Sequence, residues 1–261
     1  MGLCRGNVRK TGRIFELAKR RNWSQEEVHY ALALYLVTDF GRFHSRNPDV
    51  INLATQLGRT PSAVALKLSN LAALDASIPQ KGMANASNMD RQVWIEFLAN
   101  PNNVLKAYEH QSLSPPAEPT VEFDFTAASE RRVETTQRVG QSFFRKIILT
   151  SYRKRCALTG IEETRLLNAS HIVAWKDDPQ NRINPSNGIC LNALHDRAFD
   201  QHLITFDENY KMIIADYLPV RARQELERVE TGKLKLPSRF LPDQRFLEQH
   251  RRAFNEKTEG I

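Results

Sequence analysis

Residues that could together hydrolyse a phosphate ester lie between positions 171 and 200 of this 261-residue sequence. His171 could accept a proton from water, because an unperturbed imidazole has a pKa of about 6.5 and is largely neutral at working pH. Asn187 carries an amide, which can orient a neighbour without titrating. Asp196 and Asp200 are four positions apart, so on a helix they share one face. Such a carboxylate pair predicts an oxygen site for Mg²⁺ or Mn²⁺.

The elements that must position these residues can be predicted from local patterns. Residues 169–172 and 188–191 have the composition of short strands, and a short helix is expected near 194–200, where the aspartates fall. Upstream, residues 140–155 place Phe and Ile on one helical face and Arg and Lys on the other, which predicts an amphipathic helix. Downstream, residues 203–214 have a hairpin-like pattern.

The stretch from Cys156 to Asp207 resembles the HNH endonuclease family, in the form common among predicted restriction enzymes. The matching pieces are Cys-x-x-Thr-Gly at 156–160, Ala-Ser-His-Ile at 169–172, Asn-Pro-x-Asn-Gly at 184–188 and Leu-His-Asp-Arg-Ala-Phe-Asp at 194–200. The resemblance implies a ββα-metal fold, in which two strands, a loop and a helix hold one divalent cation against a phosphodiester. It also implies that His171 is the general base.

Asn187 matches the family's middle asparagine, which ties down the loop and orients the base. Asn184 is a rival for that role, and Asn187 is preferred because it directly precedes the Gly-Ile-Cys-Leu strand. Many relatives place His or Asp immediately before the base, where this sequence has Ser170. His195 would supply the third letter of HNH, as a catalytic residue, metal ligand or phosphate contact, and the sequence does not rank it against Asp196.

The three cysteines, Cys4, Cys156 and Cys190, form no CxxC pair. Relatives with a zinc knuckle carry two such pairs around this core, so no structural Zn²⁺ is expected. The cysteines are predicted to be reduced.

A formal net charge of +7 makes a polyanion the natural partner. The basic side chains are concentrated in residues 1–22 and 131–155, and such clusters favour phosphate contact through counterion release. The predicted DNA contacts are Arg145, Lys146, Arg153, Lys154, Arg155, Arg197 and Lys67.

The front of the chain has the pattern of a helical module. Ser24 followed by Glu27 forms a capping box before an apolar-periodic helix, and a second helix is predicted over 49–58. Thr60 caps the next helix, and a fourth is expected over 88–99.

A helix, a turn containing Gly58 and a second helix outline a helix-turn-helix. On that interpretation the helix from Pro61 enters a major groove with Ser62, Lys67 and Asn70 outward. A plain helical bundle used for dimerisation would show the same periodicity.

The predicted fold class is α+β. Residues 1–110 form an all-α, helix-turn-helix-like DNA-binding domain, residues 111–135 a Pro-rich linker, and residues 136–261 an HNH nuclease domain with a C-terminal extension. No apolar run approaches the roughly 20 residues that span a bilayer, and no signal peptide is evident, so a cytoplasmic location is expected.

Two functions remain after these considerations. The first is a metal-dependent DNA endonuclease, in restriction or phage defence. The alternative is a DNA-binding regulator with an inactive HNH domain. It is retained because Ser170 stands where many relatives have His or Asp. A homodimer is one option in either case.

Overall fold

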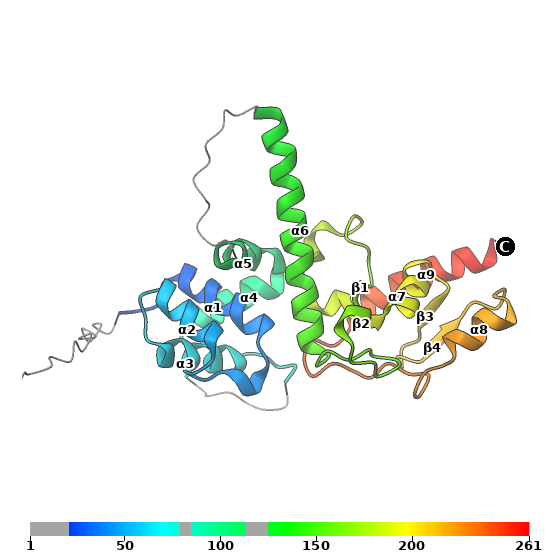
Figure 1. The fold of residues 1–261 in the computed structure, drawn as a ribbon, viewed down its shortest axis with the longest axis horizontal. Coiled ribbons are helices and arrows are strands. Elements are labelled where there is room, and N and C mark those ends of the chain that lie inside the picture. The colour runs from blue at the N-terminus through cyan, green and yellow to red at the C-terminus, as the bar shows by residue number, and fades with distance from the viewer. Residues whose placement is uncertain (1–20, 79–84, 113–124, 261) are drawn as a thin grey trace, which may run out of the picture.

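The computed structural model describes residues 21–78, 85–112 and 125–260. It has a helical region (21–112) and a strand region (125–260). The strand region begins with the long helix α6, which stands between the helical region and the strands (Figure 1). The helical region contains α1 (Gln25–Val37), α2 (Pro48–Gln56), α3 (Pro61–Ala72), α4 (Asn88–Ala99) and α5 (Leu105–Ser112). The strand region contains α6 (Phe125–Ser151), β1 (Leu167–His171), β2 (Gly188–Asn192), α7 (Ala193–Asp200), β3 (Ile204–Phe206), β4 (Met212–Ile214), α8 (Val220–Leu226) and α9 (Gln244–Glu259). Within the described ranges, no helix is both long and apolar enough to cross a membrane.

The predicted helix starts are present. The Ser24 hydroxyl accepts from the Glu27 N–H, and the Glu27 carboxylate accepts in return from the Ser24 N–H, so α1 begins with a full capping box. Thr60 caps α3, its hydroxyl accepting from the Ala63 N–H. Between α2 and α3 the chain turns at Gly58, whose φ of 60° lies in the left-handed region that glycine adopts without strain.

Two strands and a following helix form the ββα unit. β1 and β2 are antiparallel, in a register that pairs Leu167 with Asn192 and His171 with Gly188. α7 begins directly after β2, and the Asn192 side chain caps it by accepting from the His195 N–H. The second hairpin, β3 with β4, confirms the pattern seen over 203–214.

Helix α6 is longer than the sequence predicted. It begins at Phe125, so the last part of the predicted linker is helical, while 113–124 lie outside the described residues. β2 starts in direct contact with α6: a Cβ on Gly188 would lie 2.5 Å from the side chains of both Phe144 and Ile148. The absence of a side chain at Gly188 therefore lets the hairpin pack against α6.

The helical and strand regions share one continuous hydrophobic core. Tyr108 of α5 stacks on Phe143 of α6, with ring centroids 4.1 Å apart. From the far end of the chain, the buried Arg239 guanidinium donates to the backbone carbonyls of Tyr35 and Leu36, at 3.0 and 2.6 Å. The division of the chain into two domains stays a prediction.

The expected orientation of α3 needs a correction. Ser62 is exposed, but Lys67 is only 4% exposed and Asn70 only 8%, so the prediction that Lys67 and Asn70 face outward is wrong. Lys67 lies inside because Asp90 of α4, itself fully buried, accepts from its ammonium at 2.5 Å. Helical periodicity shows which residues share a face of α3, but it does not show that the Asp90 carboxylate lies opposite Lys67. The basic cluster at the N-terminus lies outside the described residues, except for its last part from Arg21.

Candidate active site

A pocket of about 670 Å³ opens where β1, α7, α9 and the middle of α6 meet. His171 at the end of β1 and Asp196 on α7 both line it. We call it the β1–α7 pocket. Its other lining groups include Gln141 of α6, Trp175 and Lys176. The strand, the helix and the loop after β1 therefore bring a candidate base and a candidate metal ligand to one cavity.

The position of the His171 imidazole is set from two sides. Its Nε2 lies 2.9 Å from the carbonyl oxygen of Arg182, which can only accept, so in the neutral ring Nε2 carries the hydrogen. Nδ1 then has the lone pair, and among the described residues it has no hydrogen-bond partner. The ring stacks on Phe144, centroids 3.7 Å apart, and meets the edge of Trp175 at 5.5 Å.

The surroundings of His171 favour the neutral form. Burial lowers the pKa of His171 below its ordinary value, while the Arg182 carbonyl and the Asp196 carboxylate oppose the shift. Near neutral pH the imidazole is therefore uncharged and able to take up a proton.

The carboxylate of Asp196 is held by two side chains from β1. The Ser170 hydroxyl donates to one oxygen and the Asn168 amide to the other, each at 2.6 Å. Ser170, which departs from the family pattern, is thus a hydrogen-bond donor to the neighbouring carboxylate. The sequence analysis assigned no such role to Ser170 or Asn168. Their spacing of two, which puts them on one face of a strand, was the available signal.

Asn187 is buried and fastens the loop between β1 and β2. Its Oδ1 accepts from the Val173 N–H at 2.8 Å, and its amide donates to the carbonyls of Val173 and Asn181. Its own carbonyl accepts from the Ile172 N–H. Asn187 thereby fixes the chain next to His171 without contacting the imidazole. The rival Asn184 is used locally, since its side chain caps the turn at Ser186.

The structure does not bring His195 into the β1–α7 pocket. Its side chain is 1% exposed, with Nδ1 3.0 Å from the Asn192 amide oxygen and Nε2 3.0 Å from the carbonyl oxygen of Leu226. Both ring nitrogens therefore face acceptor oxygens inside the protein, and the one N–H of the neutral ring can donate to one of them. The geometry separates the two unranked candidates, because Asp196 faces the pocket and His195 does not.

The family model described as HNH endonuclease matches residues 156–207. These residues form an HNH endonuclease domain. The match contains β1, β2 and α7 with His171 and Asp196, so the matched domain supplies one side of the pocket, and α6 and α9 complete it. An HNH domain implies a nucleic acid substrate and, typically, a divalent metal. No curated protein matches the sequence significantly.

The second predicted carboxylate, Asp200, lies at the rim of the HNH domain's pocket. It lines the cavity but is largely exposed, and its nearest cation is Arg197, 3.4 Å away on the same helix. Beyond it, the rings of His202 and His250 stack with centroids 4.5 Å apart and form part of the wall. Burial lowers the pKa of His250 to about 3, with the neighbouring His202 as a second cause.

The metal-binding capacity of the HNH domain is limited. Among the residues that the structure describes, no group of three or more His, Cys, Asp or Glu side chains is arranged to hold a metal ion. Mg²⁺ needs less, because it usually keeps several waters and binds through one or two carboxylates and substrate phosphates. The Asp196 carboxylate, oriented by two donors and open to the pocket, fits that requirement.

The predicted DNA-contacting cations occupy different places. Arg145 donates to the carbonyls of Thr164 and Leu167, and so anchors the start of β1 to α6. The exposed cations Arg153, Lys154 and Arg155 follow the end of α6 at Ser151. With a rise of about 1.5 Å per residue, Ser151 lies roughly 15 Å along the helix from Gln141 in the pocket wall. Lys146 is exposed on α6 and lies 5.3 Å from the ring of Tyr108. Lys176, which the sequence analysis did not single out, does line the pocket.

Proposed function

We propose that the chain is a metal-dependent DNA endonuclease that acts in the cytoplasm, with His171 as general base and Asp196 as the main protein ligand of the metal. The observation that carries the proposal is the orientation of His171. Its Nε2 faces the Arg182 carbonyl, which leaves the Nδ1 lone pair free of protein partners beside an oriented carboxylate. The two ring nitrogens of the buried His195, by contrast, both face oxygen atoms inside the protein, and His195 does not line the pocket.

In the proposed reaction, Nδ1 of His171 removes a proton from water as the water oxygen attacks the phosphorus of a phosphodiester. One ester P–O bond breaks as the new P–O bond forms, and the products end in a phosphate and a hydroxyl. Ser170 and Asn168 keep the Asp196 carboxylate in place during the step. A bound divalent cation would supply neutralisation of the charge that develops on the phosphate and the leaving oxygen.

DNA binding is proposed from the charge and the helical region. The net charge of +7 favours phosphate, and Lys176, Arg197 and the exposed cations at the end of α6 supply positions for backbone contacts. α2 and α3, joined by the Gly58 turn, are proposed as a helix-turn-helix-like element that docks against the duplex. With Lys67 buried, any contact from α3 would come from its exposed residues, such as Ser62.

The alternative, a regulator with an inactive HNH domain, rested on Ser170. The hydrogen bond from the Ser170 hydroxyl to Asp196 supports a working site, because it gives Ser170 a role in orienting that carboxylate. The endonuclease is therefore the better supported of the two.

The test is cleavage of supercoiled plasmid by the purified protein with Mg²⁺, with Mn²⁺ and with EDTA. We expect nicked circles that require metal, and a fall of about 10²- to 10⁴-fold in rate for His171→Ala, because a general base typically contributes that much. His44→Ala, an exposed histidine of the helical region, is the control and should cleave normally. Metal-independent cleavage, or equal rates for His171→Ala and the native protein, would refute the assignment.

The same gel reports on assembly. One HNH centre cuts one strand at a time, so a monomer should accumulate nicked circles before linear DNA. Linear product without a nicked intermediate would indicate a homodimer that cuts both strands in one encounter. Restriction or phage defence is proposed as the setting from the sequence resemblance alone. Phage plaque counts on cells that express the native protein, compared with His171→Ala, test it.

A further inference from the structure

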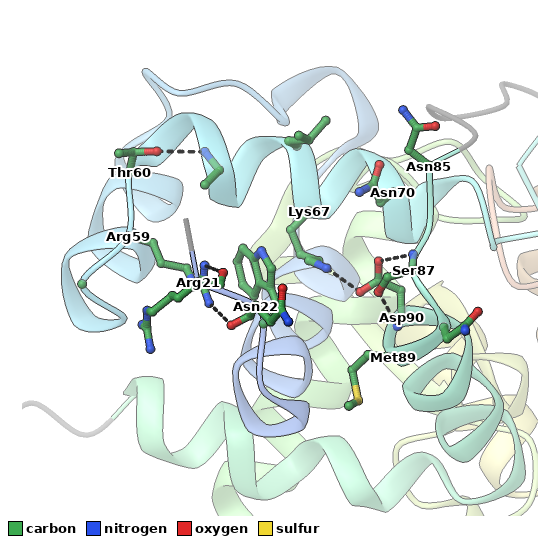
Figure 2. Close-up of a pocket in the computed structure, with 15 residues that line it drawn as sticks. Arg21, Asn22, Arg59, Thr60, Lys67, Asn70, Asn85, Ser87, Met89 and Asp90 are labelled. Atoms are coloured by element: carbon green, nitrogen blue, oxygen red, sulfur yellow. Dashed lines mark hydrogen bonds and ion pairs between the residues drawn. The ribbon is translucent and has the colours of Figure 1, made fainter. Parts of the chain in front are cut away.

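A second pocket, of about 980 Å³, lies in the helical region between α3 and the start of α4 (Figure 2). The segment before α1 closes one side of it with Asn22 and Trp23. None of its lining residues lines the β1–α7 pocket. We call it the α3–α4 pocket. The proposed cleavage reaction does not involve it.

The cations that line the α3–α4 pocket are already bound by carboxylates. Arg21 and Arg59 both donate to Glu27, and Lys67 donates to Asp90. Arg59 and Lys67 also lie over the ring of Trp23, 4.1 and 4.7 Å from its centroid. Glu27 and Asp90 therefore offset two of these three positive charges, and the buried cations Arg59 and Lys67 each have a carboxylate partner within the protein.

Asparagine side chains that line the pocket, unlike the cations, have no hydrogen-bond partner among the described residues. Asn70 is 8% exposed, and its Oδ1 is buried without any hydrogen-bond partner. Figure 2 shows its amide between Lys67 and Asn85, on the pocket side of α3. Asn85 and Asn88 are exposed, and within the described residues their side chains make no hydrogen bond to the protein, so their amides are open to solvent at the pocket. A buried amide without a partner lowers stability, and a ligand that offers both a donor and an acceptor would recover that loss.

We infer that the α3–α4 pocket binds a single nucleobase through the amides of Asn70 and Asn88. An uncharged planar base carries donors and acceptors side by side on its edge, and asparagine pairs with such an edge through both atoms of its amide. Where the base belongs to DNA, this inference rests on the proposed function, and the base must leave the helical stack to enter a pocket. A free nucleoside would present the same edge, and the experiment separates the two sources.

The test uses a DNA duplex with one central 2-aminopurine, whose fluorescence rises when the base is unstacked, in EDTA so that no cleavage occurs. Affinity is measured in parallel by the anisotropy of a labelled duplex. We expect the native protein to raise the 2-aminopurine signal. Asn70→Ala and Asn88→Ala should abolish the rise and weaken binding about tenfold. Asn103→Ala, an exposed amide after α4 and outside this pocket, is the matched control and should behave as the native protein.

Thermal unfolding distinguishes a ligand contact from a structural one. Asn70→Ala removes an unpartnered group, so its melting temperature should equal or exceed that of the native protein. Duplex binding without a rise in 2-aminopurine fluorescence, or native affinity in Asn70→Ala, would overturn the inference and leave the endonuclease proposal intact.

A free-nucleoside arm covers failure of the DNA proposal. If no duplex binds but adenosine, guanosine, cytidine or thymidine raises the melting temperature of the native protein and not of Asn70→Ala, the pocket takes a free nucleobase. In that case the proposed DNA substrate is lost instead. If neither duplex nor nucleoside acts through Asn70, the inference is wrong.

Discussion

Lys67 in the helical region and His171 in the strand region are both polar side chains predicted to meet DNA, and the structure treats them differently. Lys67 is buried, and its charge is neutralised by Asp90. His171 gives one nitrogen to the Arg182 carbonyl and keeps the other open to a pocket. Residue type alone therefore does not identify a reactive group. What identifies it is an atom left without a protein partner beside a cavity.

The difference extends to how each region buries titratable side chains. The helical region buries ion pairs, as Lys67 with Asp90 and Arg59 with Glu27 show. The strand region buries imidazoles whose pKa values are lowered by burial, as in His171, His195 and His250. Ion pairs therefore join elements of the helical region, whereas two of these imidazoles, those of His171 and His250, line the proposed reaction centre.

The largest effect is expected where a buried charge loses its partner. Lys67→Met leaves the fully buried Asp90 carboxylate uncompensated, and we expect the free energy of unfolding to fall by about 3–5 kcal/mol. Denaturant unfolding measures the change.

The double variant Lys67→Met, Asp90→Asn is the control, because it removes both charges. It should recover part of the lost stability, although Asp90 also caps α4 through Ser87. A single variant as stable as the native protein would show that the pair is not structural and would weaken the contrast with His171.

A smaller effect is expected from acid. In the neutral ring of His250 the Thr205 hydroxyl can donate to Nδ1 while Nε2 donates to the Phe199 carbonyl, so both nitrogens have a partner without a buried charge. Burial and the neighbouring His202 lower the folded pKa of His250 to about 3, with Arg251 adding to the shift and Asp200 opposing it.

The unfolded chain takes up this proton below its ordinary pKa of about 6.5, whereas the folded protein does not until about pH 3. The stability that His250 contributes is therefore complete above pH 6.5 and is lost as the pH falls towards 3. Between pH 7 and pH 5 we expect the stability difference between the native protein and His250→Gln to shrink by about 2 kcal/mol. A difference that stays constant over this range would contradict the neutral assignment.

The smallest effect is expected from Ser170→Ala, which removes one of the two donors that orient Asp196. We expect cleavage to fall about tenfold and the Mg²⁺ concentration for half-maximal rate to rise, because groups that orient a ligand typically contribute 10- to 100-fold. Ser170→Thr, which keeps a hydroxyl, should restore most of the rate. Ser142→Ala on the exposed face of α6 is the control. An unchanged metal dependence in Ser170→Ala would reduce Ser170 to a packing residue.

Sequence reasoning located the helices and the nuclease motif because their signals are local. Caps such as Ser24 and Thr60 act within one turn, and the residues of the ββα unit are close in sequence. The burial of Lys67 and the second partner of His195 depend on residues 23 and 31 positions away. No local pattern carries such contacts, so they could not be predicted. The link from Ser170 to Asp196 spans 26 residues and is of the same kind.

Arg239 has a consequence for how the protein is made. Its guanidinium binds the Tyr35 carbonyl across 204 positions of the chain. At the usual rate of synthesis, about 5–20 residues per second, roughly 10 to 40 s pass between the two residues leaving the ribosome. During that interval α1 lacks the side chain that satisfies the carbonyls of Tyr35 and Leu36. The helical region therefore completes its packing only after the whole HNH domain has been synthesised.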